Sequence, residues 1–161
     1  MKNKLSKSAF ILLLITSICE LFLIIQAKKK YDNKEKFIRK VCSNYDTVYQ
    51  WLNLKDRKGK VSDYCEEKGI KTVAIYGMGD LGNLLYNELT ENSIEVKYAI
   101  DINAKMLDSK IEVVQPSEVI EMEAVDCVIV SAVFAFDTIV VTLQDKLNCP
   151  IISLMECLVE A

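Results

Sequence analysis

The sequence of 161 residues contains no histidine, which removes the commonest general base and metal ligand at neutral pH. Its six cysteines form no CxxC pair and show no metal-ligand spacing, so we expect no metal site and interpret the thiols as reduced and structural. Basic residues do not predominate either: the net charge is −3, and nothing in it suggests nucleic acid as a partner. These absences narrow the candidate functions to ones that need neither a metal nor a histidine.

Glycine and proline are also scarce, with five and two residues, whereas hydrophobic residues make up 51 % of the chain and argue against disorder. Three of the five glycines, Gly77, Gly79 and Gly82, nevertheless fall within six residues of one another. Glycine is favoured where the backbone takes a positive φ or where another group must approach closely. This cluster therefore marks a turn with a special backbone.

The longest apolar segment, Ala9 to Ala27, has 19 residues and a single charge, Glu20. As a helix it would be about 28 Å long, close to the ~30 Å hydrocarbon core of a bilayer. Its twelve Leu, Ile and Phe residues favour insertion by roughly −4 to −7 kcal/mol, which exceeds the cost of about 3 kcal/mol for the carboxyl. The segment is predicted to enter the membrane, where Glu20 is either a functional group or a carboxyl that is protonated or reaches the interface.

Cleavage and orientation follow from the residues around this segment. Ile25 and Ala27 match a signal-peptidase site poorly, so we favour an uncleaved anchor over a signal peptide. Positive charge is heavier after the segment than before it, which predicts a single-pass protein of the cell membrane with a cytoplasmic C-terminal domain. The flanking cations are Lys2, Lys4 and Lys7 on one side and Lys28, Lys29, Lys30, Lys34, Lys36, Arg39 and Lys40 on the other.

The chain is expected to have three parts: a membrane anchor with basic flanks (1–30), a helical connector (31–69) and an α/β domain (70–161). In the connector, residues 33–57 carry apolar residues at three- and four-residue steps, which predicts a helix that packs on the following domain. Self-association, or a helix that lies on the membrane surface, is the alternative. The apolar positions are Phe37, Val41, Tyr45, Val48 and Leu52, and Ile38, Tyr49 and Trp51 widen this apolar face.

The last part alternates between strand and helix patterns. Strands are expected at 72–76, 94–100, 111–114, 126–132 and from Pro150, and helices at 80–91, 117–123, 136–147 and the C-terminus. In the helix over 80–91 we expect Leu81, Leu84, Leu85 and Leu89 to lie on one face. Strands separated by helices of this length predict an α/β fold with a compact, five-stranded parallel sheet of strand order 3-2-1-4-5.

The glycine cluster lies where the first of these strands meets its helix. The predicted binding residues are Gly77, Met78, Gly79, Asp80, Leu81 and Gly82 in the turn, Asp101 after the second strand and Ser131 after the fourth. In this geometry helix amides bind a phosphate and the acid accepts a hydrogen bond from a ribose hydroxyl. Asp80 would repel a phosphate, and the turn has no Lys or Arg. The alternative is that the glycines serve only tight strand–helix packing.

Several segments resemble a known group: "VAIYGMGDLG", "YAIDINAK", "IEVVQPSEV", "VDCVIVSAVFAFDTI" and "CPIISLMECL". They are similar to the small Rossmann-like domains of bacterial surface-polysaccharide biosynthesis proteins, including the N-terminal nucleotide-sugar-binding domain of PglD/NeuD-type sugar acyltransferases. The resemblance covers roughly residues 70 to 160 and implies that the three glycines face phosphates and Asp101 a ribose. Those acyltransferases continue into a hexapeptide-repeat β-helix with a catalytic histidine, which this chain lacks, so acyl transfer is not implied.

No convincing catalytic set accompanies the turn. We therefore expect a membrane-anchored accessory or regulatory protein that binds a nucleotide, a nucleotide-sugar or NAD, with the membrane, a glycan-biosynthesis enzyme and further copies of itself as partners. Two alternatives stay open: an NAD-dependent oxidoreductase or epimerase-like subunit completed by a partner, and an interaction scaffold that binds no ligand. Phe134 and Phe136 are expected either to line a base-binding wall or to pack in the core.

Overall fold

The computed structural model describes residues 7–161, so Lys2 and Lys4 lie outside the described residues. The chain divides into two compact units, Met1–Val41 and Cys42–Ala161. Helix α1 (Lys7–Asp56) begins in the first unit and ends in the second. One helix was expected over 33–57 and another across the apolar segment; both belong to this single helix.

Within the first unit, α1 contains an 18-residue window that is long and apolar enough to cross a membrane, and none of that window is buried. It is the one helix of this kind among the described residues. Its length, composition and position near the N-terminus are those of a single membrane span or of a signal sequence.

The second unit contains the expected sheet. Five parallel strands lie in the order β3-β2-β1-β4-β5, which confirms the predicted fold class. The order places β1 beside β4 at the point where the chain changes from one side of the sheet to the other. The strands are β1 (Thr72–Tyr76), β2 (Glu95–Ile100), β3 (Val113–Val114), β4 (Cys127–Val130) and β5 (Ile151–Ser153).

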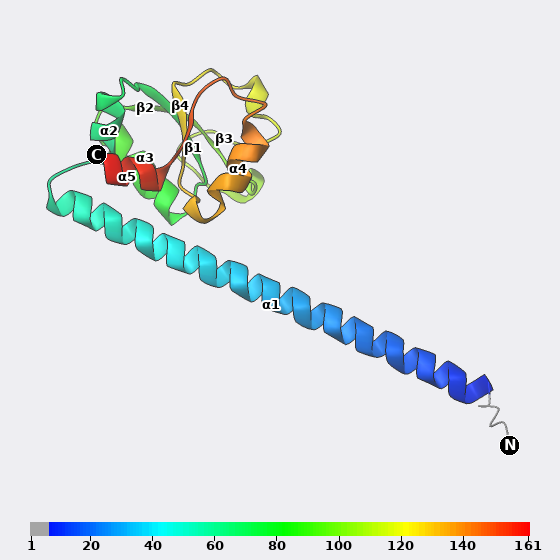
Figure 1. Cartoon of the computed structure of the whole chain (residues 1–161). Coiled ribbons are helices and arrows are strands. Elements are labelled where there is room, and N and C mark those ends of the chain that lie inside the picture. The colour runs from blue at the N-terminus through cyan, green and yellow to red at the C-terminus, as the bar shows by residue number, and fades with distance from the viewer. Residues whose placement is uncertain (1–6) are drawn as a thin grey trace. The chain divides into compact units, whose positions relative to one another are not determined.

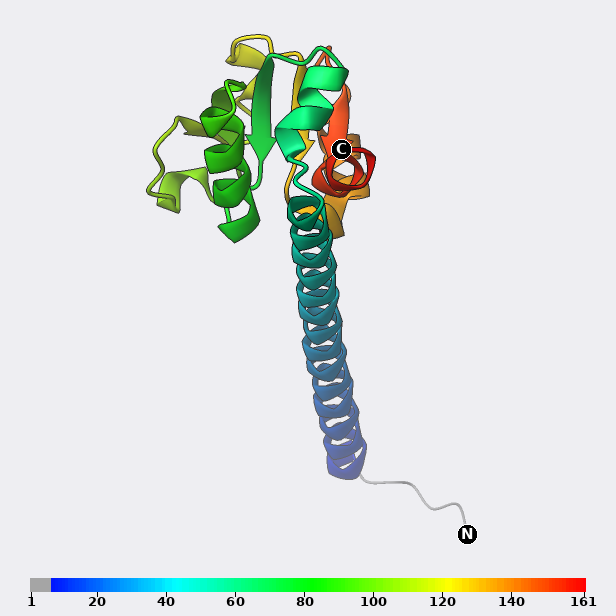
Figure 2. The ribbon, with the colours of Figure 1, turned by 90° about the vertical axis from the view of Figure 1, so that its left-hand side faces the viewer.

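Helices cover both faces of this sheet because its buried strands present apolar side chains on both sides. Val73 and Ile75 of β1 pack with α2 (Val61–Glu67), α3 (Asp80–Glu91) and α5 (Leu154–Glu160), whereas Ala74 and Tyr76 pack with α4 (Phe136–Leu143). Figures 1 and 2 show α2 and α5 side by side, and Tyr64 of α2 donates a hydrogen bond to Glu156 of α5 at 3.2 Å. Short 3-10 turns complete the unit at η1 (Ala104–Met106), η2 (Val119–Glu121) and η3 (Val133–Ala135).

Several elements are shorter than the sequence pattern indicates, among them β4, which was expected over 126–132 and extends only over Cys127–Val130. The third strand pairs over Val113–Val114 alone, at the edge of the sheet and just before Pro116, which has no N–H to donate. The segment 117–123 forms only the 3-10 turn η2, and α4 ends at Leu143 instead of Leu147. The apolar pattern locates these elements but does not determine where pairing stops.

The connector helix packs on the following domain as expected, but through only part of its predicted apolar face. Trp51, together with Leu54, is buried in the core of the second unit, whereas Val48 and Leu52 are exposed. On α3, Leu84 is 52 % exposed, while Glu88 is only 8 % exposed. The two buried residues meet, because Trp51 donates a hydrogen bond to Glu88.

Candidate functional site

The glycine turn joins β1 to α3 at the carboxyl edge of the sheet. Gly77 has φ +94°, a conformation that residues with a Cβ rarely adopt. Gly82 lies in the first turns of α3, where a Cβ would come within 1.9 Å of the Gly77 carbonyl oxygen. These two glycines are therefore required by the backbone of the turn itself.

Gly79 is different, because neither its backbone nor its surroundings require a glycine. Its φ is −74°, and no atom lies within 4 Å of the position that a Cβ would occupy. Gly79 is also the N-cap of α3, so no side chain of its own can accept hydrogen bonds from the first amides of the helix. An exposed glycine at the start of a helix leaves those amides accessible to an anion.

Asp101 reaches this turn from the end of β2. Its Oδ2 accepts a hydrogen bond from the Met78 N–H at 3.0 Å, and its Oδ1 accepts one from the Asn103 N–H at 2.8 Å. Burial, and next the nearby charge of Asp101, raise the pKa of the Tyr76 hydroxyl. A carboxylate oxygen can accept more than one hydrogen bond, so these contacts leave room for a ligand hydroxyl.

Ser131 also reaches the turn, from the end of β4, but its side chain is buried. Its Oγ lies 2.6 Å from the Gly77 carbonyl oxygen and 3.2 Å from that of Tyr76, and the hydroxyl donates to these carbonyls. The contact holds the end of β1 against the end of β4. Ser131 thus stabilises the turn from beneath it.

Apolar side chains follow the strands at the same edge, and two of them, Ile102 and Met106, were not singled out in the sequence. Ile102 and Met106, which come just after Asp101, are 68 % and 87 % exposed. Of the two phenylalanines expected in a base-binding wall or in the core, Phe134 is exposed, whereas Phe136, the first residue of α4, is partly buried and packs against the core. Isolated apolar residues in irregular loops have no periodicity, so no sequence pattern distinguishes them.

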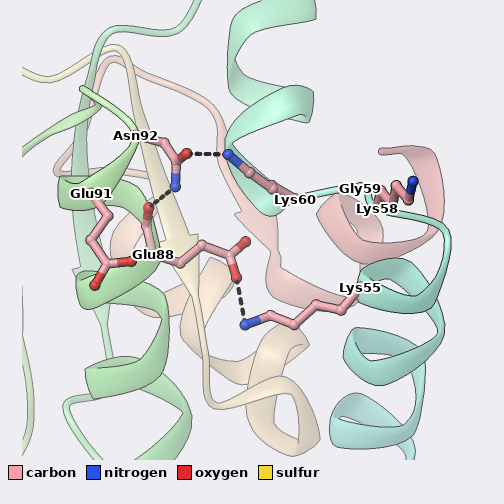
Figure 3. Close-up of a pocket in the computed structure, with 7 residues that line it drawn as sticks. All are labelled: Lys55, Lys58, Gly59, Lys60, Glu88, Glu91 and Asn92. Atoms are coloured by element: carbon pink, nitrogen blue, oxygen red, sulfur yellow. Dashed lines mark hydrogen bonds and ion pairs between the residues drawn. The ribbon is translucent and has the colours of Figure 1, made fainter.

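Away from the glycine turn, a hollow lies beside the C-terminal half of α3, within the second unit (Figure 3). Its volume is about 450 Å³, and its lining includes Lys55, Lys60, Glu88 and Asn92. The polar groups of the lining interact with one another. Lys60 Nζ donates a hydrogen bond to Asn92 Oδ1 at 2.6 Å, and Lys55 Nζ forms an ion pair with Glu88 Oε2 at 3.5 Å. These pairings give the hollow a structural role in joining helices.

Glu88 is the centre of that joint, and no sequence pattern distinguishes it from the other acidic residues of the helix. Trp51 Nε1 donates to its Oε2 at 2.9 Å, and the Val61 N–H donates to its Oε1 at 2.6 Å. A single buried carboxylate thereby connects α1, α2 and α3.

Within residues 7–161, no group of three or more acidic, cysteine or histidine side chains could hold a metal ion. The six cysteines are free, and Cys65, Cys127 and Cys157 are buried. Burial raises the pKa of Cys65 to about 11, so this thiol stays protonated near neutral pH.

The described geometry defines the class of the second unit, a Rossmann-like α/β domain with a glycine turn at its strand-order switch point. Comparison of the chain with protein-family models, curated proteins and solved structures gives no match.

Proposed function

We propose that this protein is a membrane-anchored accessory or regulatory protein whose Rossmann-like domain binds a nucleotide, a nucleotide-sugar or NAD at the glycine turn. The observation that carries the proposal is Gly79, a glycine with no structural requirement at the exposed start of α3. Asp101 lies on the same turn, bonded to the amide of Met78. A backbone site for phosphate and an acceptor for ribose are thus adjacent.

Each part of such a ligand has a matching group in the glycine turn or in the loops beside it. The first amides of α3 would bind a phosphate, and Asp101 would accept from a ribose hydroxyl. Ile102, Met106 and Phe134 offer exposed apolar surface for the flat face of a base. The carboxylate disfavours a ligand with a 2′-phosphate, because two negative charges would meet.

The role in cell-surface polysaccharide biosynthesis is supported by the sequence resemblance described above, and a glycan-biosynthesis enzyme is the partner it suggests. An NAD-dependent oxidoreductase or epimerase-like subunit, completed by a partner chain, is the second candidate. The observation that favours it is Asp101, since a carboxylate suits the free 2′-hydroxyl of NAD.

Ligand-dependent thermal unfolding of the full chain in detergent tests the site. The panel comprises UDP, UDP-sugars, CDP- and GDP-sugars, NAD and NADP. At one hundred times its dissociation constant a ligand adds about 2.7 kcal/mol, which raises the melting temperature by roughly 10 °C for a domain of this size. We expect a shift with at least one compound, and Gly79→Val to abolish it while Asn87→Val, on an exposed part of the same helix, does not.

A shift with NAD in preference to UDP-sugars would favour the oxidoreductase candidate, and a preference for NADP would contradict the role given to Asp101. If no compound raises the melting temperature, or if Gly79→Val binds as well as the parent protein, the turn is not a binding site. The scaffold alternative would then stand.

Thiol labelling tests the anchor and its orientation. Cys42, the residue to be labelled, is exposed just beyond the first unit. Cys149 is partly buried, and burial raises the pKa of its thiol. It is replaced by serine so that it does not add to the labelling. In spheroplasts we expect a membrane-impermeant maleimide to label Cys42 only after permeabilisation. A cysteine introduced in place of Lys4 should be labelled without permeabilisation. Labelling of Cys42 in intact spheroplasts, or its absence from the membrane fraction, would contradict the proposed topology.

A further inference from the structure

The last four turns of α1 carry apolar residues on two faces, and only one of them is covered. Thr47, Trp51 and Leu54 are buried in the second unit. Tyr45, Val48 and Leu52 are exposed, at 70 %, 40 % and 61 %. A helix that packs on one domain needs a single apolar face, so the second face requires another explanation.

The spacing of the second face is specific. Ile38, Val41, Tyr45, Val48 and Leu52 follow one another at steps of three, four, three and four, and all five are exposed. This alternation is the a/d repeat with which one helix packs against another of the same pitch in a coiled coil. We refer to these five positions as the α1 seam.

The same register continues into the apolar segment of α1. Counting back by sevens from Val41 leads through Lys34 and Ala27 to Glu20, the single charged residue of that segment. Counting back by sevens from Ile38 leads to Ser17. In lipid, polar side chains favour helix–helix interfaces, where they can form hydrogen bonds to a neighbouring helix. A partner on the α1 seam would therefore also remove Glu20 from contact with lipid.

One pair of flanking charges suits a second copy in parallel orientation. In such a pair a g position faces the e position five residues later on the other helix. Lys30 and Glu35 occupy these positions, so each helix would place a lysine opposite a glutamate of the second copy. Copies inserted in a membrane with one topology are necessarily parallel, and confinement to the membrane raises their local concentration.

We propose that the protein forms a parallel homodimer along the α1 seam, extending from Ser17 in the membrane to Leu52. The inference rests on the membrane anchoring of the proposed function but not on ligand binding. The part outside the membrane has only two well-formed heptads, fewer than an isolated coiled coil needs, so the membrane segment must contribute. Beside the seam, Trp51 and Leu84 line an apolar hollow of about 210 Å³ with Val48 and Leu52, which extends the contact surface onto α3.

Cysteine cross-linking of the full chain in membranes tests this proposal. In a background with Cys19, Cys42 and Cys149 replaced by serine, single cysteines are introduced at Val41 or Val48, on the seam. Asp46→Cys serves as the matched control, because this exposed position lies on another face of the helix. After mild oxidation we expect the two seam variants to form a disulfide-linked species at twice the 18.3 kDa mass of the chain, at least fivefold more than the control.

Equal cross-linking at all three positions, or none at Val41 and Val48, would overturn the proposal. An adduct of a different mass would also overturn it, since it would identify another protein as the occupant. A further variant, Tyr45→Lys, places a charge in the seam and should reduce cross-linking at Val48 severalfold. In a strain that retains Cys42, the same variant should leave the maleimide labelling of Cys42 unchanged. Cross-linking without any ligand-induced thermal shift would leave the dimer standing and the nucleotide site rejected.

Discussion

Replacement of Gly82 by alanine is expected to lower the melting temperature of the second unit by roughly 10–15 °C. The added Cβ would lie 1.9 Å from the Gly77 carbonyl oxygen, a backbone atom that cannot move aside as a flexible side chain would. Relief requires α3 to shift from β1, and overpacking of this kind costs about 3 kcal/mol. Thermal unfolding followed by the fluorescence of the single tryptophan, which is buried at position 51, measures the effect.

Gly79→Ala is the matched control, three residues away in the same turn. Its φ of −74° suits alanine, and no atom lies within 4 Å of the new Cβ, so we expect its stability to change by less than about 1 kcal/mol. A melting temperature for Gly82→Ala within 2 °C of the parent protein, on the order of 0.5 kcal/mol, would contradict the close approach of α3 to β1. The pair separates a glycine needed for folding from one available for binding.

Replacement of Glu88 by alanine is expected to destabilise the second unit by about 3–4 kcal/mol. The change leaves two buried donors, Trp51 Nε1 and the Val61 N–H, without their acceptor, and each unsatisfied donor costs about 1–3 kcal/mol. Because Trp51 is one of those donors, its emission should also shift to longer wavelength before the main transition. Denaturant unfolding gives the free energy, and the native-state spectrum gives the shift.

Two further variants test whether the loss of stability comes from the missing acceptor. Glu88→Gln keeps one acceptor oxygen but turns an amide toward the other donor, so about half of the loss is expected. Lys55→Ala removes only an exposed amine 3.5 Å from Glu88, and such surface pairs contribute less than about 1 kcal/mol. If Glu88→Ala were no more damaging than Lys55→Ala, the carboxylate would not be the element that joins α1 to the sheet domain.

These residues also determine which part of the chain a binding experiment must contain. Trp51 and Leu54 are buried in the core of the second unit, although they belong to α1. A fragment that begins at residue 60 would remove both and would leave Glu88 without one of its donors. The α/β domain therefore includes the end of the helix that precedes it.

The sequence alone predicted the parts of this protein that depend on local pattern. Apolar runs located β1 and β4, period-two alternation located β2, and α3 has the predicted bounds Asp80–Glu91. Alternation of strand and helix then predicted the strand order, because right-handed crossovers leave few arrangements for five parallel strands. The glycine turn was recognisable as well, since a positive φ and a close strand–helix approach both restrict the residue type.

Only the tertiary structure decided which polar groups are buried and which apolar groups are not. On α3, Glu88 is buried and Leu84 is exposed. Burial of the Glu88 carboxylate is favourable because Trp51, 37 residues before it in the chain, donates a hydrogen bond to it. Asp101 and Ser131 contact the turn through bonds to Met78 and Gly77, and these bonds depend on how three strand ends meet. Hydrophobic periodicity describes one element at a time, whereas each of these contacts joins elements that are distant in sequence.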